Sequence, residues 1–224
     1  MTQHFCLEVA GDFACFTRPE MKAERVSYDI MTPSACRAVF EAILWKPAIR
    51  WVPETIEVLA PIRWISLRRN EVGSKISVAN VKSVMNNGSG QLGMYIEDDR
   101  QQRAGLFLRD VRYRLTAHFE LTERAGASDN IAKFSDMFER RAQRGQCINQ
   151  PYLGCREFAC DFRWVTPGDI ASVPDELQGE RPLGWMLYDL DFTNPADPSP
   201  RFFNAVLNDG VLRIPEWNSQ EVRG

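Results

Sequence analysis

The sequence has very little histidine, and this limits the chemistry available to it. Only His4 and His118 occur among 224 residues, and none of the six cysteines forms a CxxC pair. Zinc sites usually show pairs of cysteines or histidines at short spacing. We therefore predict no metal and no other cofactor, and expect the cysteines to be reduced and mostly structural.

Long hydrophobic runs are absent as well. No apolar segment approaches the roughly 20 residues that a membrane helix needs. The N-terminal MTQHFCLEVAGDF lacks the basic start and apolar stretch of a secretion signal. We therefore expect a cytoplasmic location and no membrane partner. The hydrophobic fraction of 44% and charged fraction of 25% are typical of a globular protein.

An overall excess of positive charge is also missing, because the formal net charge is −3. The charge is nevertheless uneven: residues 1–150 carry 21 Lys and Arg against 18 Asp and Glu, whereas residues 151–224 carry 6 against 12. Phosphate contacts depend on local potential and not on net charge. A basic binding surface on the first part explains this asymmetry, and ordinary solvated surface charge explains it equally well.

Hydrophobic periodicity predicts an α+β domain. Alternation indicates strands at residues 4–10, 49–59, 113–121 and 158–164. A first helix begins at Pro33 after the capping residue Thr32 and ends before Pro47, and a second follows Asp129 or Asn130. This order, strand-helix-strand twice, is typical of a ferredoxin-like or RRM-like domain.

Two further segments complete the predicted organisation. Residues 73–93 are polar and small, with a turn signal at 86–88, and predict a mobile loop or a protruding hairpin inserted in the domain. After a turn-rich linker at 166–182, apolar runs at 185–192, 202–207 and 211–214 predict a small C-terminal antiparallel β-sheet. The expected domains are thus 1–165, ferredoxin-like, and 166–224, a small β domain.

Several long blocks of the sequence resemble one known family. The first is TRPEMKAERVSYDIMTPSACRAVFEAILWKPAIRW at 17–51, and others are RRNEV at 68–72, RQQRAGLFLRDV at 100–111, AHFELT at 117–122 and LGCREF at 153–158. These blocks resemble the CRISPR-associated Cas-five proteins of subtype I-C, a branch of the RAMP superfamily. The similarity covers most of residues 5–160 and thins out beyond about residue 165.

The resemblance implies both an activity and partners. It implies an endoribonuclease that cuts the precursor CRISPR RNA at its repeat hairpin without metal and stays bound to the 5′ handle. The implied partners are the Cas-seven backbone and Cas-eight large subunits of the surveillance complex. A non-catalytic RNA-binding subunit that caps the 5′ handle is the alternative.

The catalytic residues that the family often uses are only partly present. Family members often carry a Tyr or His just before the WKP motif and a Lys-His pair at the start of the second helix. Here the corresponding residues are Leu44, Lys133 and Phe134. Leu44 and Phe134 cannot exchange a proton. Lys133 is predicted to stabilise charge on the phosphate, or else to be a surface cation paired with Asp129.

Two other side chains are candidate substitutes in the cleavage reaction. Tyr28 is a possible proton donor, although packing in the core with a satisfied hydroxyl is the alternative. His118 is a possible general base, although a strand residue held by local hydrogen bonds is the alternative.

Basic residues of the first part are the candidates for RNA binding. Arginine suits this role because its planar fork meets phosphate oxygens and stacks on bases. The predicted set is Arg18, Lys22, Arg25, Arg68, Arg69, Arg100 and Arg103. Surface cations or ion-paired arginines explain each position about equally well. Aromatic side chains add little, because Trp45, Trp51 and Trp64 lie among apolar neighbours and are expected in the core.

Overall fold

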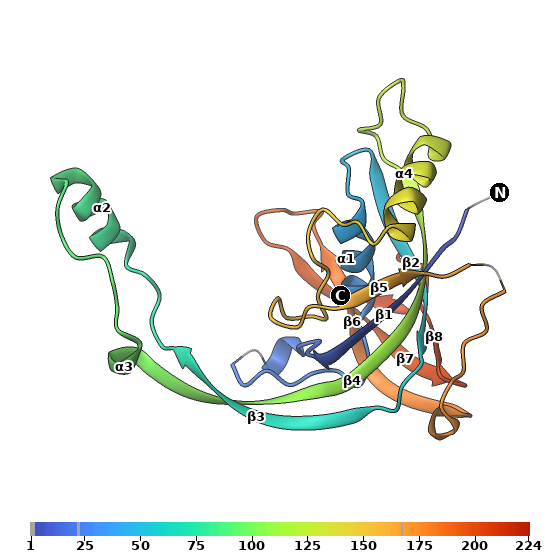
Figure 1. Ribbon diagram of the computed structural model, residues 1–224, viewed down its shortest axis with the longest axis horizontal. Helices are drawn as coiled ribbons and strands as arrows, with labels where there is room; N and C mark the ends of the chain where they lie inside the picture. Colours follow the sequence, from blue (N-terminus) through green and yellow to red (C-terminus); the bar gives the residue numbers. More distant parts are fainter. Residues whose placement is uncertain (1–2, 22, 167) are drawn as a thin grey trace.

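One antiparallel sheet runs through the chain in the computed structural model, which describes residues 3–21, 23–166 and 168–224. In this described part its strands are β1 (Phe5–Ala14), β2 (Ile49–Val58), β3 (Arg63–Val72), β4 (Arg100–Leu121), β5 (Asp161–Trp164), β6 (Glu180–Asp191), β7 (Ser199–Asn208), β8 (Val211–Arg213) and β9 (Val222–Arg223). Their order is β5-β1-β4-β2-β8-β7-β6, with β3 beside β4 and β9 beside β7. The fold is therefore α+β with a large antiparallel sheet, as Figure 1 shows.

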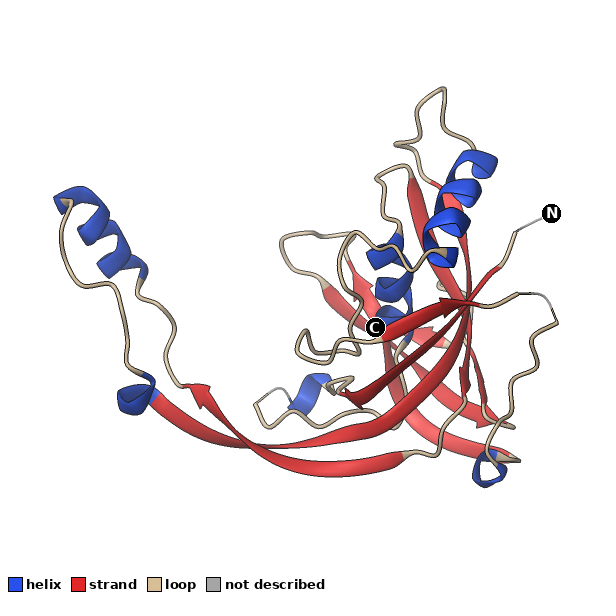
Figure 2. Cartoon of the chain, viewed as in Figure 1, coloured by secondary structure: helices blue, strands red, loops and turns tan. Residues whose placement is uncertain are grey.

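Helices α1 (Pro33–Ile43) and α4 (Ile131–Gln143) begin where the sequence predicts. The Thr32 side chain accepts a hydrogen bond from the Ala35 N–H, and Pro33 occupies the first turn of α1. Asn130 caps α4 in the same way, by accepting from the Lys133 N–H at 2.9 Å. Both helices lie beside the sheet (Figure 2) and bury one apolar face.

An aromatic cluster forms the core beneath these two helices. The Phe138 ring of α4 lies 4.6 Å from Trp51, 5.1 Å from Phe5 and 5.7 Å from Phe40 between ring centroids. Such pairs add about 0.5–1.5 kcal/mol each beyond the burial of apolar area. Alternate residues of β1, β2 and β4 supply the strand side of this core, so the opposite face of these strands carries polar side chains.

A long two-stranded hairpin projects from the body (Figure 1). It pairs β3 with the first half of β4, from Arg63 opposite Arg109 to Val72 opposite Arg100. Its tip holds the helices α2 (Val78–Asn87) and α3 (Ile96–Asp99).

Residues 73–93 therefore protrude as predicted, but they contain a helix that the sequence did not suggest. The Ser77 hydroxyl caps α2 by accepting from the Asn80 N–H, and Gly88 ends the helix in the left-handed region at φ 65°. The Asn-Asn-Gly segment thus ends a helix instead of turning a hairpin.

The C-terminal strands are antiparallel, as predicted, but they continue the main sheet instead of forming a sheet of their own. Strand β8 pairs with β2, with Ile56 opposite Leu212, and joins β7 and β6 to the body. Arg37 of α1 also pairs with Asp189 of β6 at 2.8 Å, so this helix contacts both halves of the sheet. Two short 3-10 helices, Pro19–Met21 and Asp175–Leu177, lie in connecting segments. None of the helices in the described residues is long and apolar enough to cross a membrane.

Candidate nucleic-acid interface and cleavage site

Lys133 lies in the first turn of α4, and 43% of its side chain is exposed. Its ammonium donates to Asp129 Oδ1 at 2.8 Å. This hydrogen bond, together with one from the Gly126 N–H, holds the pKa of the Asp129 carboxyl below its usual value. The carboxylate therefore stays charged and holds a solvent-exposed ammonium in place, where it can meet a phosphate.

The loop after α1 lies close enough to Asp129 for its charge to act on that carboxyl. Trp45, which was expected in the core, is 53% exposed, and Lys46 beside it is also exposed. The loop is attached to the end of β4, because the Thr122 hydroxyl donates to the Pro47 carbonyl at 2.6 Å. The charge of Lys46 also contributes to lowering the pKa of Asp129. We call Trp45, Lys46, Asp129 and Lys133 the α1–α4 corner.

The α1–α4 corner combines groups that suit single-stranded RNA. An exposed indole can stack on a base, and two ammonium groups can contact phosphate oxygens. The sequence drew attention to Lys133 alone. The WKP motif carried a signal for the other two side chains, but Trp45 was interpreted as a core residue.

A second basic group lies where the hairpin leaves the body. Arg25, Arg69 and Arg103 converge there on two carboxylates, and we call them the arginine cluster. Glu157 lies 2.6 Å from Arg69 and 3.0 Å from Arg25, while Glu71 lies 3.3 Å from Arg25 and 3.6 Å from Arg103. Three guanidinium groups therefore face two carboxylates, and the structure brings together three of the predicted RNA-binding residues.

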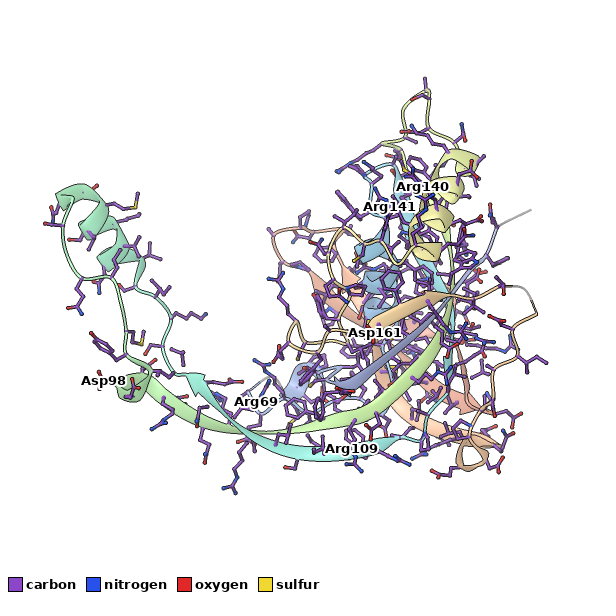
Figure 3. All side chains as sticks on the ribbon, in the orientation of Figure 1. Arg69, Asp98, Arg109, Arg140, Arg141 and Asp161 are labelled. Carbon is purple, nitrogen blue, oxygen red and sulfur yellow. The ribbon has the colours of Figure 1, made fainter. Side chains whose placement is uncertain are left out.

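The remaining predicted arginines are more scattered. Arg68 and Arg100 are exposed on the hairpin, and within the described residues neither forms an ion pair. Arg18 pairs with Asp29 at 3.3 Å, and Lys22 lies outside the described residues. The sequence analysis missed Arg63 and Arg109, which face each other across the hairpin. Figure 3 shows Arg69 and Arg109 along this hairpin, with Arg140 and Arg141 on α4.

Comparison with known families agrees with the resemblance seen in the sequence. The family model of the Cas5d group, described as a CRISPR-associated protein, matches residues 5–215. The chain belongs to the Cas5d family. The match thus extends through β8, beyond the region where the quoted motifs were found.

Two curated relatives match all or nearly all of the chain. The chain is 48% identical over 226 residues to a protein of Mannheimia succiniciproducens named CRISPR pre-crRNA endoribonuclease Cas5d, with all of both chains covered. It is 39% identical over 233 residues to the protein of the same name from Thermus thermophilus, covering 96% of this chain and 93% of the relative.

Solved structures share the fold at much lower identity. A crystal structure of a CRISPR-associated protein aligns with a TM-score of 0.71 at 20% identity, covering 100% of this chain and 97% of the other. A protein of Streptococcus mutans aligns with a TM-score of 0.69 at 19% identity, covering 100% and 98%. The Cas5d chain therefore has a fold that is known experimentally.

Two of the catalytic positions expected from the Cas5d resemblance lie in the core. Leu44 is fully buried and ends α1, with its carbonyl accepting the Trp51 indole N–H at 2.8 Å. Phe134 is buried against Phe119, 6.3 Å between ring centroids. Neither side chain has a proton to exchange, so Lys133 is the one residue of the expected set that retains a charge.

The structure places Tyr28, the candidate substitute proton donor, in the core. The side chain is buried, and its hydroxyl accepts the Leu187 N–H at 3.1 Å. Burial raises the pKa of the phenol. The Arg18 guanidinium covers the ring at 4.4 Å. These contacts tie the Tyr28 segment to β6, and a proton-donor role for its hydroxyl stays a prediction.

His118 lies on the other face of the sheet from Lys133. It lies on β4 next to Phe119, and because Phe119 points toward α4, alternation places His118 on the opposite face of the sheet. There its Nδ1 lies 2.6 Å from Glu54 Oε1. Within the described residues, no hydrogen bond or ion pair connects His118, Tyr28 and Lys133, so the three do not form one catalytic group.

Proposed function

We propose that this chain is an endoribonuclease that cuts precursor CRISPR RNA within its repeat and remains bound to the 5′ handle. The observation that carries this proposal is the match, over the full length of the chain, to a relative named for that activity, at 48% identity. The exposed Lys133 of the α1–α4 corner supports it. The enzyme would act in the cytoplasm, where the precursor is transcribed.

The proposed reaction is an internal transesterification that needs no metal. The ribose 2′-hydroxyl loses its proton to water as its oxygen attacks the adjacent phosphorus, and the bond from phosphorus to the 5′-oxygen breaks. The leaving 5′-oxygen takes a proton from water, so a 2′,3′-cyclic phosphate and a 5′-hydroxyl result. Negative charge builds on the phosphate oxygens as this happens, and the Lys133 ammonium would stabilise it. Stacking of a base on Trp45 would align the attacking oxygen, and alignment supplies a large part of such a barrier.

The rest of the RNA would follow the basic surfaces of the first part. The arginine cluster and the hairpin arginines Arg68 and Arg100 can contact phosphates without reading sequence. The Cas-seven and Cas-eight subunits are the proposed protein partners. The exposed apolar side chains at the hairpin tip, such as Ile76 and Met85, support docking to another protein.

The proposed fold assignment follows from strand order. Strands β5-β1-β4-β2 lie in this order, and α1 and α4 connect them as a strand-helix-strand unit repeated twice, which supports a ferredoxin-like domain at 1–165. Residues 166–224 would form a smaller unit that extends the sheet of the first.

A second candidate function is a non-catalytic subunit that caps the 5′ handle. The burial of Leu44 and Phe134 favours it, because no proton donor or acceptor occupies those two positions.

The experiment that separates the two functions is incubation of the purified protein with its own repeat RNA in EDTA. A single cut that a 2′-deoxy sugar at the scissile site abolishes supports the enzyme, whereas tight binding without cleavage supports the cap.

Lys133→Ala is the variant that tests the α1–α4 corner. Removing one hydrogen-bond donor that stabilises charge in the transition state typically lowers the rate about 10²–10³-fold. Cleavage should therefore slow by that order, while repeat-RNA binding changes little. Single-turnover cleavage and filter binding measure the two quantities. Lys82→Ala, on the exposed α2, is the matched control and should cleave normally. Full activity of Lys133→Ala would remove this residue from the mechanism.

A further inference from the structure

Both histidines of the chain lie on a single carboxylate. His118 Nδ1 is 2.6 Å from Glu54 Oε1, and His4 Nδ1 is 2.8 Å from Glu54 Oε2. His4 immediately precedes β1, Glu54 lies on β2 and His118 on β4. Because β4 lies between β1 and β2, the residue before β1 meets one residue each of β2 and β4 on the face of the sheet that the helices leave uncovered.

The pairing of β2 with β4 is irregular at Glu54. Pro53 pairs with Ala117 and Thr55 with Thr116, so Glu54 has no partner residue on β4 and forms a β-bulge. A bulge turns two successive side chains toward the same face, and bulges often re-aim a functional side chain. Proline suits the position because it has no N–H to donate to the ladder. The bulge thus brings the Glu54 carboxylate to the two imidazoles.

Glu54 and Glu8 lie on the same face of the sheet but pair with different kinds of side chain. Glu8, on the same face of the sheet, forms ion pairs with Arg112, Arg114 and Arg163. Glu54 forms ion pairs only with His4 and His118 among residues 3–21, 23–166 and 168–224. Unlike the guanidinium groups around Glu8, an imidazole is also a metal ligand, and a bound cation would place positive charge next to the Glu54 carboxylate.

We propose that His4, Glu54 and His118 bind one divalent transition-metal ion, with Zn²⁺ as the expected occupant. The three ligand atoms all lie within 4.8 Å of one another. Tetrahedral zinc with bonds of 2.0–2.1 Å places its ligand atoms about 3.3 Å apart, so small side-chain rotations suffice. On binding, each imidazole carries its proton on Nε2 and turns the Nδ1 lone pair to the metal.

The ligand set determines the class of metal. Two imidazoles and one carboxylate favour zinc and related transition metals over Mg²⁺ and Ca²⁺, which prefer oxygen ligands. Three protein ligands leave a position for water, as in open zinc sites. His118 also lines a cleft of about 730 Å³ together with Arg50 and Glu120. The open position is therefore accessible, with 55% of the His4, 27% of the Glu54 and 17% of the His118 side chain exposed.

This site is separate from the proposed cleavage reaction. It lies on the sheet face opposite α4 and Lys133, and its role would be to hold the N-terminal segment to β2 and β4. The proposal therefore does not depend on RNA cleavage, and its test measures metal binding directly.

The test uses the full-length protein without an affinity tag, treated with EDTA and exchanged into chelator-free buffer. Titration with ZnCl₂ in a calorimeter should give one ion per chain, and Zn²⁺ should raise the melting temperature. His4→Ala and Glu54→Gln should each weaken binding by at least about 10-fold. Glu57→Gln, on the same strand, is the matched control and should bind Zn²⁺ like the unaltered protein.

Cobalt distinguishes this site from one built on the six cysteines. Co²⁺ bound by His4, Glu54 and His118 should give visible d–d bands without the near-ultraviolet charge-transfer absorption of a cobalt thiolate. His4→Ala is the decisive variant, because His4 is exposed and its loss should leave folding intact. Absence of stoichiometric binding, unchanged affinity in His4→Ala, or a thiolate spectrum would each overturn the proposal.

Discussion

The body of the sheet and the β3–β4 hairpin differ in how many of their side chains are buried. In the body, side chains such as Trp51 and Phe138 are almost wholly buried, and both helices are held by such contacts. In the hairpin tip, no described residue of α2 or α3 is buried, and Met85 is 75% exposed. The free energy of folding must therefore come from the body, whereas the hairpin is shaped by backbone pairing and helix caps.

The largest expected effect of a single substitution lies in the aromatic core. Phe138→Ala removes a ring that contacts Trp51, Phe5 and Phe40, and such changes cost about 3–5 kcal/mol. For a chain of this size that lowers the melting temperature by about 10 °C. Met85→Ala on α2 is the matched control and should change stability by less than about 0.5 kcal/mol. Equal losses in thermal unfolding would show that the tip stabilises the fold after all.

A smaller effect is expected where the two regions meet. Arg69 of β3 pairs with Glu157 of the body and lies over the rings of Phe107 and Phe158, at 5.0 and 5.8 Å. Arg69→Ala should cost about 1 kcal/mol, because the pair is partly exposed. It should also reduce the slope of log RNA affinity against log salt by about 1.

Arg68→Ala separates the loss of stability from the change in salt dependence. Arg68 is adjacent on β3 but exposed, so its loss should reduce the salt slope without lowering the melting temperature. Melting curves and RNA titrations over a salt series measure both. A flat salt response in the unaltered protein would contradict phosphate binding by either arginine.

The contrast between the buried body and the exposed hairpin also explains which elements the sequence could predict. In the body, Phe5, Leu7 and Val9 alternate with polar residues, and Thr32 and Asn130 mark helix starts, so strands and helices are read locally. In the hairpin both faces of the ribbon are largely exposed, so alternation is weak and β4 was expected to begin at Tyr113 instead of Arg100. Helix α2 was missed because it buries no apolar face.

The candidate sites depend on contacts between distant residues, which spacing does not reveal. Lys133 was found because its motif is local. The grouping of His4, Glu54 and His118 depends on strand register and on the bulge at Glu54, neither of which has a sequence signal beyond Pro53. The partner of the Tyr28 hydroxyl could not be predicted either, because Leu187 lies far away in the sequence on β6.

The smallest effect is expected from removing the hairpin tip altogether. Val72 pairs with Arg100, and the Gly73 N–H donates to the Asp99 carbonyl at 2.8 Å, so the chain ends flanking the tip lie side by side. Replacing residues 73–99 by Asn-Gly should close the ribbon with a two-residue turn. Because the tip buries nothing, the melting temperature should stay within about 2 °C of the unaltered protein. Cleavage of repeat RNA should persist as well, since the α1–α4 corner remains intact. A large loss of stability would instead mean that the tip helps to form the sheet, and the division of the molecule into a self-sufficient body and a dependent hairpin would be wrong.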